Sequence, residues 1–162
     1  MNASTVLCAI PDKCTGCMAC VEACSIYHVG EFDRQRARVR VLMDDAARLY
    51  MPVVCVSCPD MPCIASCPVD AIGLGDVLVP VVDMEKCTGC GSCAEACPFG
   101  HVWISDRDGL AYKCDLCGGD PQCTRVCTYD ALTKGEPSAE ATASKIHYLA
   151  TRLNRIESDS QS

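Results

Sequence analysis

Large aromatic side chains are scarce in this sequence of 162 residues, which has two Phe, one Trp and five Tyr. With so little aromatic surface to bury, a large apolar core is not expected, and another kind of cross-link should hold the chain together. No segment approaches the roughly 18 consecutive apolar residues of a membrane-spanning helix. We therefore expect no membrane insertion.

Positive charge is also scarce, because the formal net charge is −7 and the pI is near 4.8. An acidic chain repels the phosphate backbone, so the sequence predicts no nucleic-acid partner. The first residues, MNASTVLCAIPDKC, have no charged segment, no long apolar stretch and no twin arginine. We therefore predict a cytoplasmic protein without an export signal of its own. Export as the passenger of a partner that carries a signal stays open.

Cysteine, by contrast, is abundant, with 17 residues. Sixteen of the cysteines fall into four groups of four: Cys14, Cys17, Cys20 and Cys24; Cys55, Cys58, Cys63 and Cys67; Cys87, Cys90, Cys93 and Cys97; and Cys114, Cys117, Cys123 and Cys127. The seventeenth is Cys8. An odd number of cysteines without an export signal favours reduced, metal-binding thiols over disulfides.

The groups are repeated in pairs. Residues 13–24 (KCTGCMACVEAC) and 86–97 (KCTGCGSCAEAC) are identical at nine of twelve positions. Residues 55–72 also align with 114–132 if one extra residue is allowed. The pattern indicates duplication of an ancestor that already held two groups.

The spacing C-x2-C-x2-C-x3-C, often followed by Pro, is the bacterial ferredoxin run that binds [4Fe–4S] clusters. Gly16 and Gly89 stand where a tight loop needs a positive φ. A zinc site of four cysteines usually has two CxxC pairs separated by a longer stretch, so zinc is disfavoured. All four groups are complete, which predicts four [4Fe–4S] clusters. Their complete ligand sets leave no open iron site, and no catalytic motif is present, so we predict a chain that is not an enzyme.

Between the groups, alternating or β-branched residues predict strands at 37–43, 77–84 and 101–105, with Pro80 restricting the second to a sheet edge. A short helix is expected before the last cysteine of each group. An amphipathic helix is predicted at 136–157, with an apolar stripe at Ile146, Leu149, Leu153 and Ile156, before a disordered tail at 158–162.

The order of the groups, the wider loops in the second and fourth, and the phrase AYKCDLC at 111–117 resemble the four-cluster ferredoxin subunits of the dimethyl sulfoxide reductase type. The resemblance implies an α+β fold over residues 1–135, built of two fused bacterial-ferredoxin-like modules, each holding two [4Fe–4S] clusters, related by pseudo-two-fold symmetry. The modules would be nested, with 1–30 and 105–135 forming one and 50–100 the other.

Spacing alone leaves two pairings of the groups open: one with two and three with four, or one with four and two with three. The resemblance implies the second pairing. Its clusters would be held by Cys14, Cys17, Cys20 and Cys127; by Cys114, Cys117, Cys123 and Cys24; by Cys55, Cys58, Cys63 and Cys97; and by Cys87, Cys90, Cys93 and Cys67.

The same resemblance implies an electron-transfer subunit that works between a large catalytic subunit and a further electron-accepting subunit. A tungsten- or molybdenum-pterin enzyme is the favoured partner, and a tungsten aldehyde oxidoreductase the first choice. Formate dehydrogenase, hydrogenase and carbon monoxide dehydrogenase partners are alternatives, as are a free polyferredoxin and end-to-end self-association.

The other candidate residues have weaker signals. Cys8 is expected to be a buried structural thiol, and His28, His101 and His147 are expected to pack rather than ligate. Lys13, Lys86 and Lys113 each precede the first cysteine of a group, where they either offset cluster charge or are simply solvated. The basic run 33–40 is favoured as a solvated strand face over a docking patch for an acidic partner.

Overall fold

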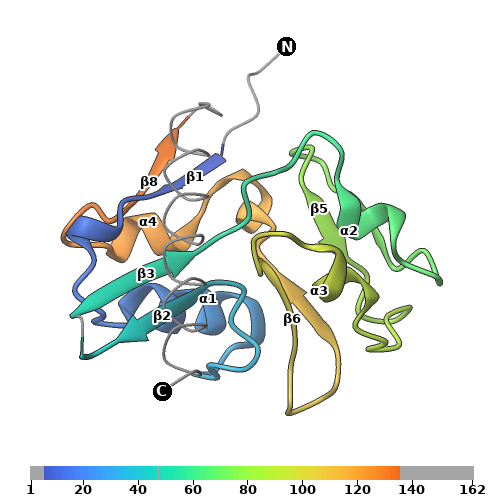
Figure 1. Cartoon of the computed structure of the whole chain (residues 1–162), viewed down its shortest axis with the longest axis horizontal. Helices are drawn as coiled ribbons and strands as arrows, with labels where there is room; N and C mark the ends of the chain where they lie inside the picture. Colours follow the sequence, from blue (N-terminus) through green and yellow to red (C-terminus); the bar gives the residue numbers. More distant parts are fainter. Residues whose placement is uncertain (1–5, 47, 136–162) are drawn as a thin grey trace, which may run out of the picture.

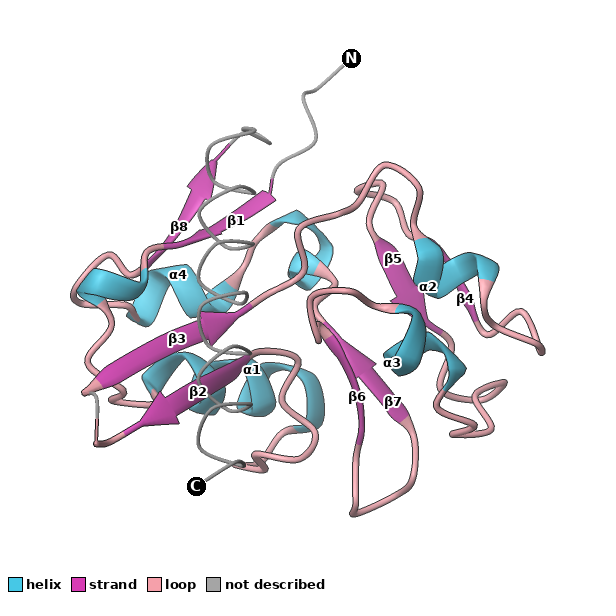
Figure 2. Cartoon of the chain, viewed as in Figure 1, coloured by secondary structure: helices cyan, strands magenta, loops and turns pink. Residues whose placement is uncertain are grey.

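The computed structural model describes residues 6–46 and 48–135. The predicted helix at 136–157, the tail at 158–162 and His147 lie outside this range. Within it, short helices alternate with four two-stranded antiparallel sheets, an α+β fold with no large sheet (Figures 1 and 2). No helix among the described residues is long and apolar enough to cross a membrane.

The two ends of the described chain come together. Strand β1 (Val6–Ala9) pairs with β8 (Leu132–Gly135), and helix α1 (Ala19–Val29) packs against α4 (Gln122–Val126). Strand β2 (Arg40–Asp44) pairs with β3 (Leu49–Val53) beside them. The buried core of this part includes Leu7, Val21, Val39 and Leu132, and these elements occupy the left of Figure 1.

The middle of the chain forms a second set of elements, on the right of Figure 1. Helix α2 (Pro62–Ala65) packs against α3 (Ser92–Ala96). Strand β4 (Ile72–Leu74) pairs with β5 (Pro80–Val82), and β6 (Val102–Ile104) pairs with β7 (Ala111–Lys113). This set has its own smaller core around Ile72, Val102 and Ala111. Two short 3-10 helices, η1 (Pro11–Lys13) and η2 (Leu116–Gly119), complete the described elements.

The predicted strands are confirmed, with shorter bounds. Residues 77–84 contribute only Pro80–Val82, and Pro80 stands at the first position of the strand, where a missing N–H costs least. The strand predicted at 37–43 begins at Arg40, because the N–H groups of Arg36 and Ala37 bond back to Asp33 in a turn. Val39 is nevertheless buried as the alternation predicts.

Helix α1 is longer than the other three cysteine helices, and its sequence explains the difference from two of them, α2 and α3. Pro68 and Pro98 follow the last cysteines of the second and third groups and cannot continue a helix. Ser25 takes that place in the first group, so α1 runs on to Val29 and ends at Gly30, with φ 77°. The buried Ser25 hydroxyl donates to the Glu31 carbonyl (2.7 Å) and accepts from the Asp33 N–H (2.8 Å), which anchors the following turn.

Candidate metal centres

Each cysteine group occupies a loop and a short helix in the same way. The first two cysteines precede the helix, and the third lies on its first turn; the fourth lies at or beyond the helix end except in α1, which includes Cys24. The third cysteine is buried in all four groups: Cys20, Cys63, Cys93 and Cys123. The exposed thiols among the described residues are Cys17 and Cys90. No disulfide is formed among the described cysteines, so all of their thiols are available to metal.

The loop between the first two cysteines has one backbone feature in common in every group. Its second residue has a positive φ: Gly16 71°, Ser57 51°, Gly89 67° and Leu116 58°. The prediction for the two glycines is confirmed. At Gly89 space also requires glycine, because a Cβ there would lie 1.8 Å from the Gly109 carbonyl oxygen.

Two cavities are each lined by four cysteines. One is lined by Cys14, Cys17, Cys20 and Cys127. The other is lined by Cys67, Cys87, Cys90 and Cys93. Each combines three cysteines of one group with the fourth cysteine of another. Thiolates converging on a hollow are the donor set that iron–sulfur clusters require.

The remaining cysteines converge in two further places. Burial, together with negative charge on Cys55 and Cys97, raises the pKa of the Cys58 thiol to about 11. Burial likewise raises the pKa of Cys24 to about 11, with a contribution from Cys117. The pKa of Cys123 is raised by burial and by four other cysteines: Cys114, Cys24, Cys117 and Cys20.

These thiols resist ionisation as isolated groups, because burial and mutual repulsion both disfavour thiolate. A bound cationic metal core removes that penalty by neutralising the thiolates it binds. The cysteines therefore fit a metal–sulfur group. The same crowding would destabilise the charged thiolates without metal.

Backbone N–H groups donate to cysteine sulfurs in several loops. The acceptors are Cys24 from Arg38 (3.1 Å), Cys67 from Ala71 (3.2 Å), Cys97 from His101 (3.3 Å) and Cys87 from Ala111 (3.5 Å). Hydrogen bonds of this kind stabilise negative charge on the sulfur and raise the potential of a cluster.

One contact to a cysteine could not be predicted from the sequence. His28 Nε2 lies 3.5 Å from Cys117 Sγ, and 3.4 Å from Asp115 Oδ1. Burial acts to raise the pKa of Asp115, but the hydrogen bond from His28 and the charge of Arg38 outweigh it and lower the pKa to about 2. His28 packs as predicted, but against a candidate ligand. His28 and Cys117 are 89 positions apart in the sequence, so local patterns could not reveal the contact.

The structure also shows where the other residues with weak sequence signals lie. His101 is buried and stacks on Phe99, with ring centroids 5.4 Å apart. Cys8 is half-buried rather than fully buried, and lies in β1 against Gly135. Lys13 and Lys86 are exposed, and Lys113 is 2% exposed.

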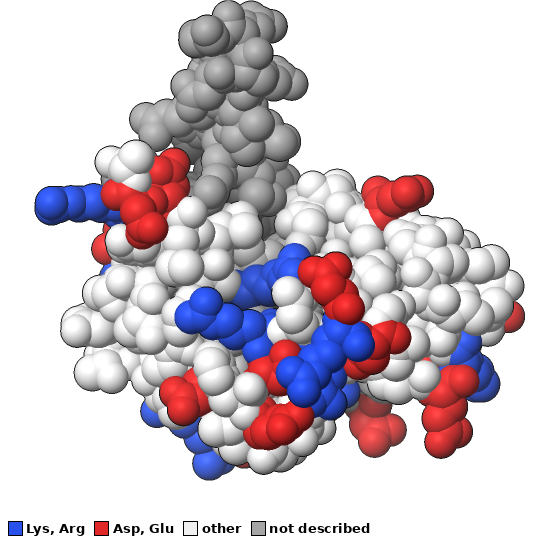
Figure 3. Space-filling view, turned by 90° about the horizontal axis from the view of Figure 1, so that it is seen from below, with Lys and Arg blue, Asp and Glu red and all other residues white. Residues whose placement is uncertain are grey.

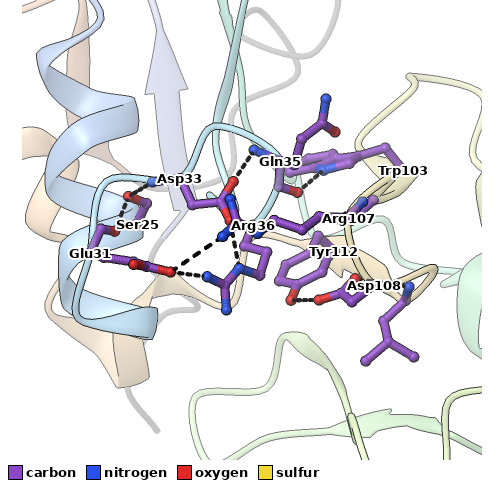
Figure 4. Close-up of polar contacts among 11 residues, drawn as sticks. Ser25, Glu31, Asp33, Gln35, Arg36, Trp103, Arg107, Asp108 and Tyr112 are labelled. Atoms are coloured by element: carbon purple, nitrogen blue, oxygen red, sulfur yellow. Dashed lines mark hydrogen bonds and ion pairs between the residues drawn. The ribbon is translucent and has the colours of Figure 1, made fainter.

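The prediction that the basic run at 33–40 forms a solvated face is wrong, except at Arg34, which is exposed. Arg36 Nε donates to Asp33 Oδ2 at 2.7 Å, and Arg107 Nε lies 3.3 Å from the same oxygen (Figure 4). Acidic and basic side chains accordingly intermingle on the face shown in Figure 3. A docking patch for an acidic partner is not favoured either, since the charges are compensated within the chain.

Two further contacts join this run to the rest of the molecule. Arg38 forms an ion pair with Asp115. The Arg40 guanidinium lies over the Trp103 ring, 4.6 Å from its centroid, and Trp103 Nε1 donates to the Gln35 carbonyl at 3.4 Å (Figure 4 shows the latter pair). The arginines thus tie β2 and the turn before it to η2 and β6.

Fold and donor set together define a ferredoxin-like iron–sulfur protein, and comparison with known proteins agrees. The family model of the 4Fe–4S binding domain matches residues 9–25 and 80–100, which contain the first and third cysteine groups. The chain is similar to the polyferredoxin-like subunit of the aliphatic sulfonate oxidoreductase of Pyrococcus furiosus, with 40% identity over 126 residues, covering 75% of this chain and 72% of that protein. It is also similar to the thiosulfate reductase electron transfer subunit PhsB of Salmonella typhi, with 33% identity over 136 residues, covering 76% and 71%.

A solved structure shares the fold. A chain of the active site complex BamBC of benzoyl coenzyme A reductase, in complex with 1,5-dienoyl-CoA, superposes with a TM-score of 0.51 and 25% identity. The match covers 94% of this chain and 92% of that one. The chain belongs to the family of ferredoxin-like iron–sulfur subunits of oxidoreductases. It is an electron-transfer subunit that holds [4Fe–4S] clusters and is not itself a catalytic subunit.

Proposed function

We propose that the chain relays single electrons through four [4Fe–4S] clusters. The ligand sets are Cys14, Cys17, Cys20 and Cys127; Cys114, Cys117, Cys123 and Cys24; Cys55, Cys58, Cys63 and Cys97; and Cys87, Cys90, Cys93 and Cys67. The observation that carries the proposal is that the first and last of these sets each line one cavity. The electrostatic coupling of Cys58 to Cys55 and Cys97, and of Cys24 to Cys117, supports the other two.

The proposed sets pair the outer groups with each other and the inner groups with each other. On this proposal residues 1–135 form two nested modules, 1–30 with 105–135 and 50–100, related by pseudo-two-fold symmetry. The packing of α1 on α4 and of α2 on α3 supports the nesting. Because each fourth cysteine closes the neighbouring cluster, cluster binding would also fasten the two halves of each module together.

The relay would run from the first group to the fourth, then to the second and the third. Exposure supports this order, since Cys17 of the first group and Cys90 of the third are the exposed thiols at its two ends. In the middle, charge on Cys55 raises the pKa of the Cys114 thiol, after the larger effect of burial, which supports a close approach of the two inner groups.

When bound, each cluster accepts and releases one electron. The chain's own groups set how readily it does so, through the N–H donors to Cys24, Cys67, Cys87 and Cys97 and through burial of the third cysteine in each group. All four protein positions around each cluster are taken by thiolates, so substrate has no place to bind iron. Electron transfer is the chemistry that remains.

The proposed partners are a large tungsten- or molybdenum-pterin oxidoreductase at one end of the relay and an electron-accepting subunit at the other. The similarity to subunits of a sulfonate oxidoreductase and of a thiosulfate reductase supports a catalytic partner of this general kind. A tungsten aldehyde oxidoreductase remains our first choice. We place the complex in the cytoplasm, where thiols stay reduced and available to metal.

Anaerobic purification of the native chain from its source tests the assignment. We expect a stoichiometric complex with a larger subunit that contains tungsten or molybdenum. Recovery at the 17.3 kDa mass of the chain alone, with its clusters intact, would instead indicate a free carrier. Recovery as a larger particle of this chain alone would indicate end-to-end association. Nickel in the larger subunit would point to a hydrogenase or carbon monoxide dehydrogenase.

A further inference from the structure

A lysine precedes the first cysteine in three of the four groups, but the structure separates one of them from the others. Lys13 and Lys86 are exposed, and Lys86 Nζ lies 3.1 Å from Asp83 Oδ2 at the surface. Lys113, at the end of β7, is 2% exposed and is among the largest fully buried side chains. Burying a flexible cationic side chain is costly unless its charge interacts with something.

The contacts of the Lys113 ammonium are with carbonyl oxygens. Nζ donates to the carbonyl of Pro80, at the start of β5, and to that of Cys114 at 2.9 Å. Within residues 6–46 and 48–135, no carboxylate forms an ion pair with it. Carbonyl dipoles solvate an ammonium but do not neutralise it, so the described residues provide no counter-charge for Lys113.

Lys113 lies where the second and fourth cysteine groups adjoin. It directly precedes Cys114 of the fourth group, and its Nζ donates to the Cys114 carbonyl. Cys114 shares one buried core with Cys55 of the second group. These two groups meet at the middle of the proposed relay, and the charge of Lys113 acts on a thiol of each, Cys63 and Cys114.

We propose that the ammonium of Lys113 is a fixed positive charge shared by the two inner clusters, where it makes both easier to reduce. The inference rests on the proposed four-cluster relay. A cluster with four thiolates is an anion, and one added electron makes it more negative. Two adjacent anions in a low-dielectric interior repel, which would lower both potentials and block the crossing from one half of the chain to the other. A cation held between them offsets that repulsion.

The exposed lysines cannot act in this way. Water and salt screen a surface charge, and Asp83 already compensates Lys86. Lys86 precedes Cys87 as Lys113 precedes Cys114, so it provides a matched control at an equivalent sequence position.

The test is a potentiometric titration of the isolated chain, followed by electron paramagnetic resonance, with dithionite as the reductant. The variants are Lys113→Gln, which keeps hydrogen-bond donors but removes the charge, Lys113→Arg, which keeps the charge, and Lys86→Gln. We expect K113Q to lower the reduction constants of two of the four clusters at least tenfold, about 59 mV for each one-electron couple. The other two clusters, and all four in K86Q, should keep their wild-type potentials.

Unchanged potentials in K113Q, or equal shifts in K113Q and K86Q, would overturn the inference. If K113Q loses iron while K113R keeps four clusters, the charge is required and the inference stands. If both lose iron, Lys113 serves packing and the inference fails. The relay itself is judged separately on the wild-type protein: fewer than four one-electron couples there would refute the proposed function, whatever the variants do.

Discussion

Arg38 and Asp115 form an ion pair between residues that are 77 positions apart in the sequence. The two side chains are 17% and 14% exposed, so the pair is largely withdrawn from water. It joins the segment entering β2 to the loop between two candidate ligands, Cys114 and Cys117. Asp115 also contacts His28, which in turn contacts Cys117.

Replacing Arg38 with Ala should therefore destabilise the protein strongly. The change leaves the buried carboxylate of Asp115 without its main cation, a loss of about 3–5 kcal/mol for a buried pair. The thermal unfolding midpoint of the cluster-loaded protein measures the effect. Arg34→Ala is the control, because Arg34 is exposed and should shift stability by no more than about 0.5 kcal/mol. Equal midpoints for the two variants would contradict the burial argument.

Gly89→Ala should disrupt the third cysteine group. A Cβ at this position would lie 1.8 Å from the Gly109 carbonyl oxygen, and φ is 67°, so the loop between Cys87 and Cys90 would have to move. Gly91 offers a control two residues away, with φ 85° but no heavy atom within 4 Å of the place that a Cβ would take. We expect G89A to lose iron, and G91A to incur only a backbone strain of about 1–2 kcal/mol and keep its iron. Iron content per chain distinguishes them.

The pairing of the groups is testable by combining alanine variants. If Cys14 and Cys127 bind the same cluster, the double variant C14A/C127A should lose the signals of no more clusters than either single variant loses. The double variant C114A/C127A should lose the signals of two clusters, because its positions belong to different ligand sets. Electron paramagnetic resonance of the reduced proteins counts the clusters. A C14A/C127A variant that loses as many cluster signals as the two single variants together would refute the pairing. Cys8→Ala is the control and should keep all of its cluster signals.

The stability contributed by Asp33 should depend on pH. The hydrogen bond from Arg36, followed by weaker interactions that include the charge of Arg107, lowers the pKa of this carboxyl group. A lowered pKa in the folded state means that the stabilisation is present above the ordinary value near 3.9 and is lost as pH falls through the lowered one. Asp33→Asn should therefore have a lower unfolding midpoint than the wild type at pH 7. The difference should shrink under acid; a constant difference would show that charge is not responsible.

Much of the local structure could be predicted because it depends on neighbouring residues. Spacing placed a short helix before each last cysteine, glycine marked the tight loops at Gly16 and Gly89, and alternation predicted the strand that runs from Arg40 to Asp44. Ser57 and Leu116 adopt the same left-handed conformation without being glycine, so nothing in their residue type revealed it. There the loop geometry overrides the local preference.

Particular long-range contacts could not be predicted from the sequence, although the resemblance implied that residues 1–30 lie with residues 105–135. The sequence around Lys113 and Lys86 does not indicate which of the two side chains is buried, because burial depends on how β5 packs beside β7. The pairing of β1 with β8 and the contact of His28 with Cys117 likewise join opposite ends of the chain. The arginines at 38 and 40 looked like a solvated face because their partners, Asp115 and Trp103, lie far away in the sequence.

The most direct measurement is the iron and acid-labile sulfide content of the chain purified without oxygen. Four cubane clusters require about sixteen of each per chain, four iron and four sulfide in every cluster. That result, with each cluster reducible by one electron, is expected for a four-cluster relay. Stoichiometric zinc with little iron would contradict the four-cluster assignment. Iron sufficient for only two clusters, in protein kept free of oxygen throughout, would also contradict it.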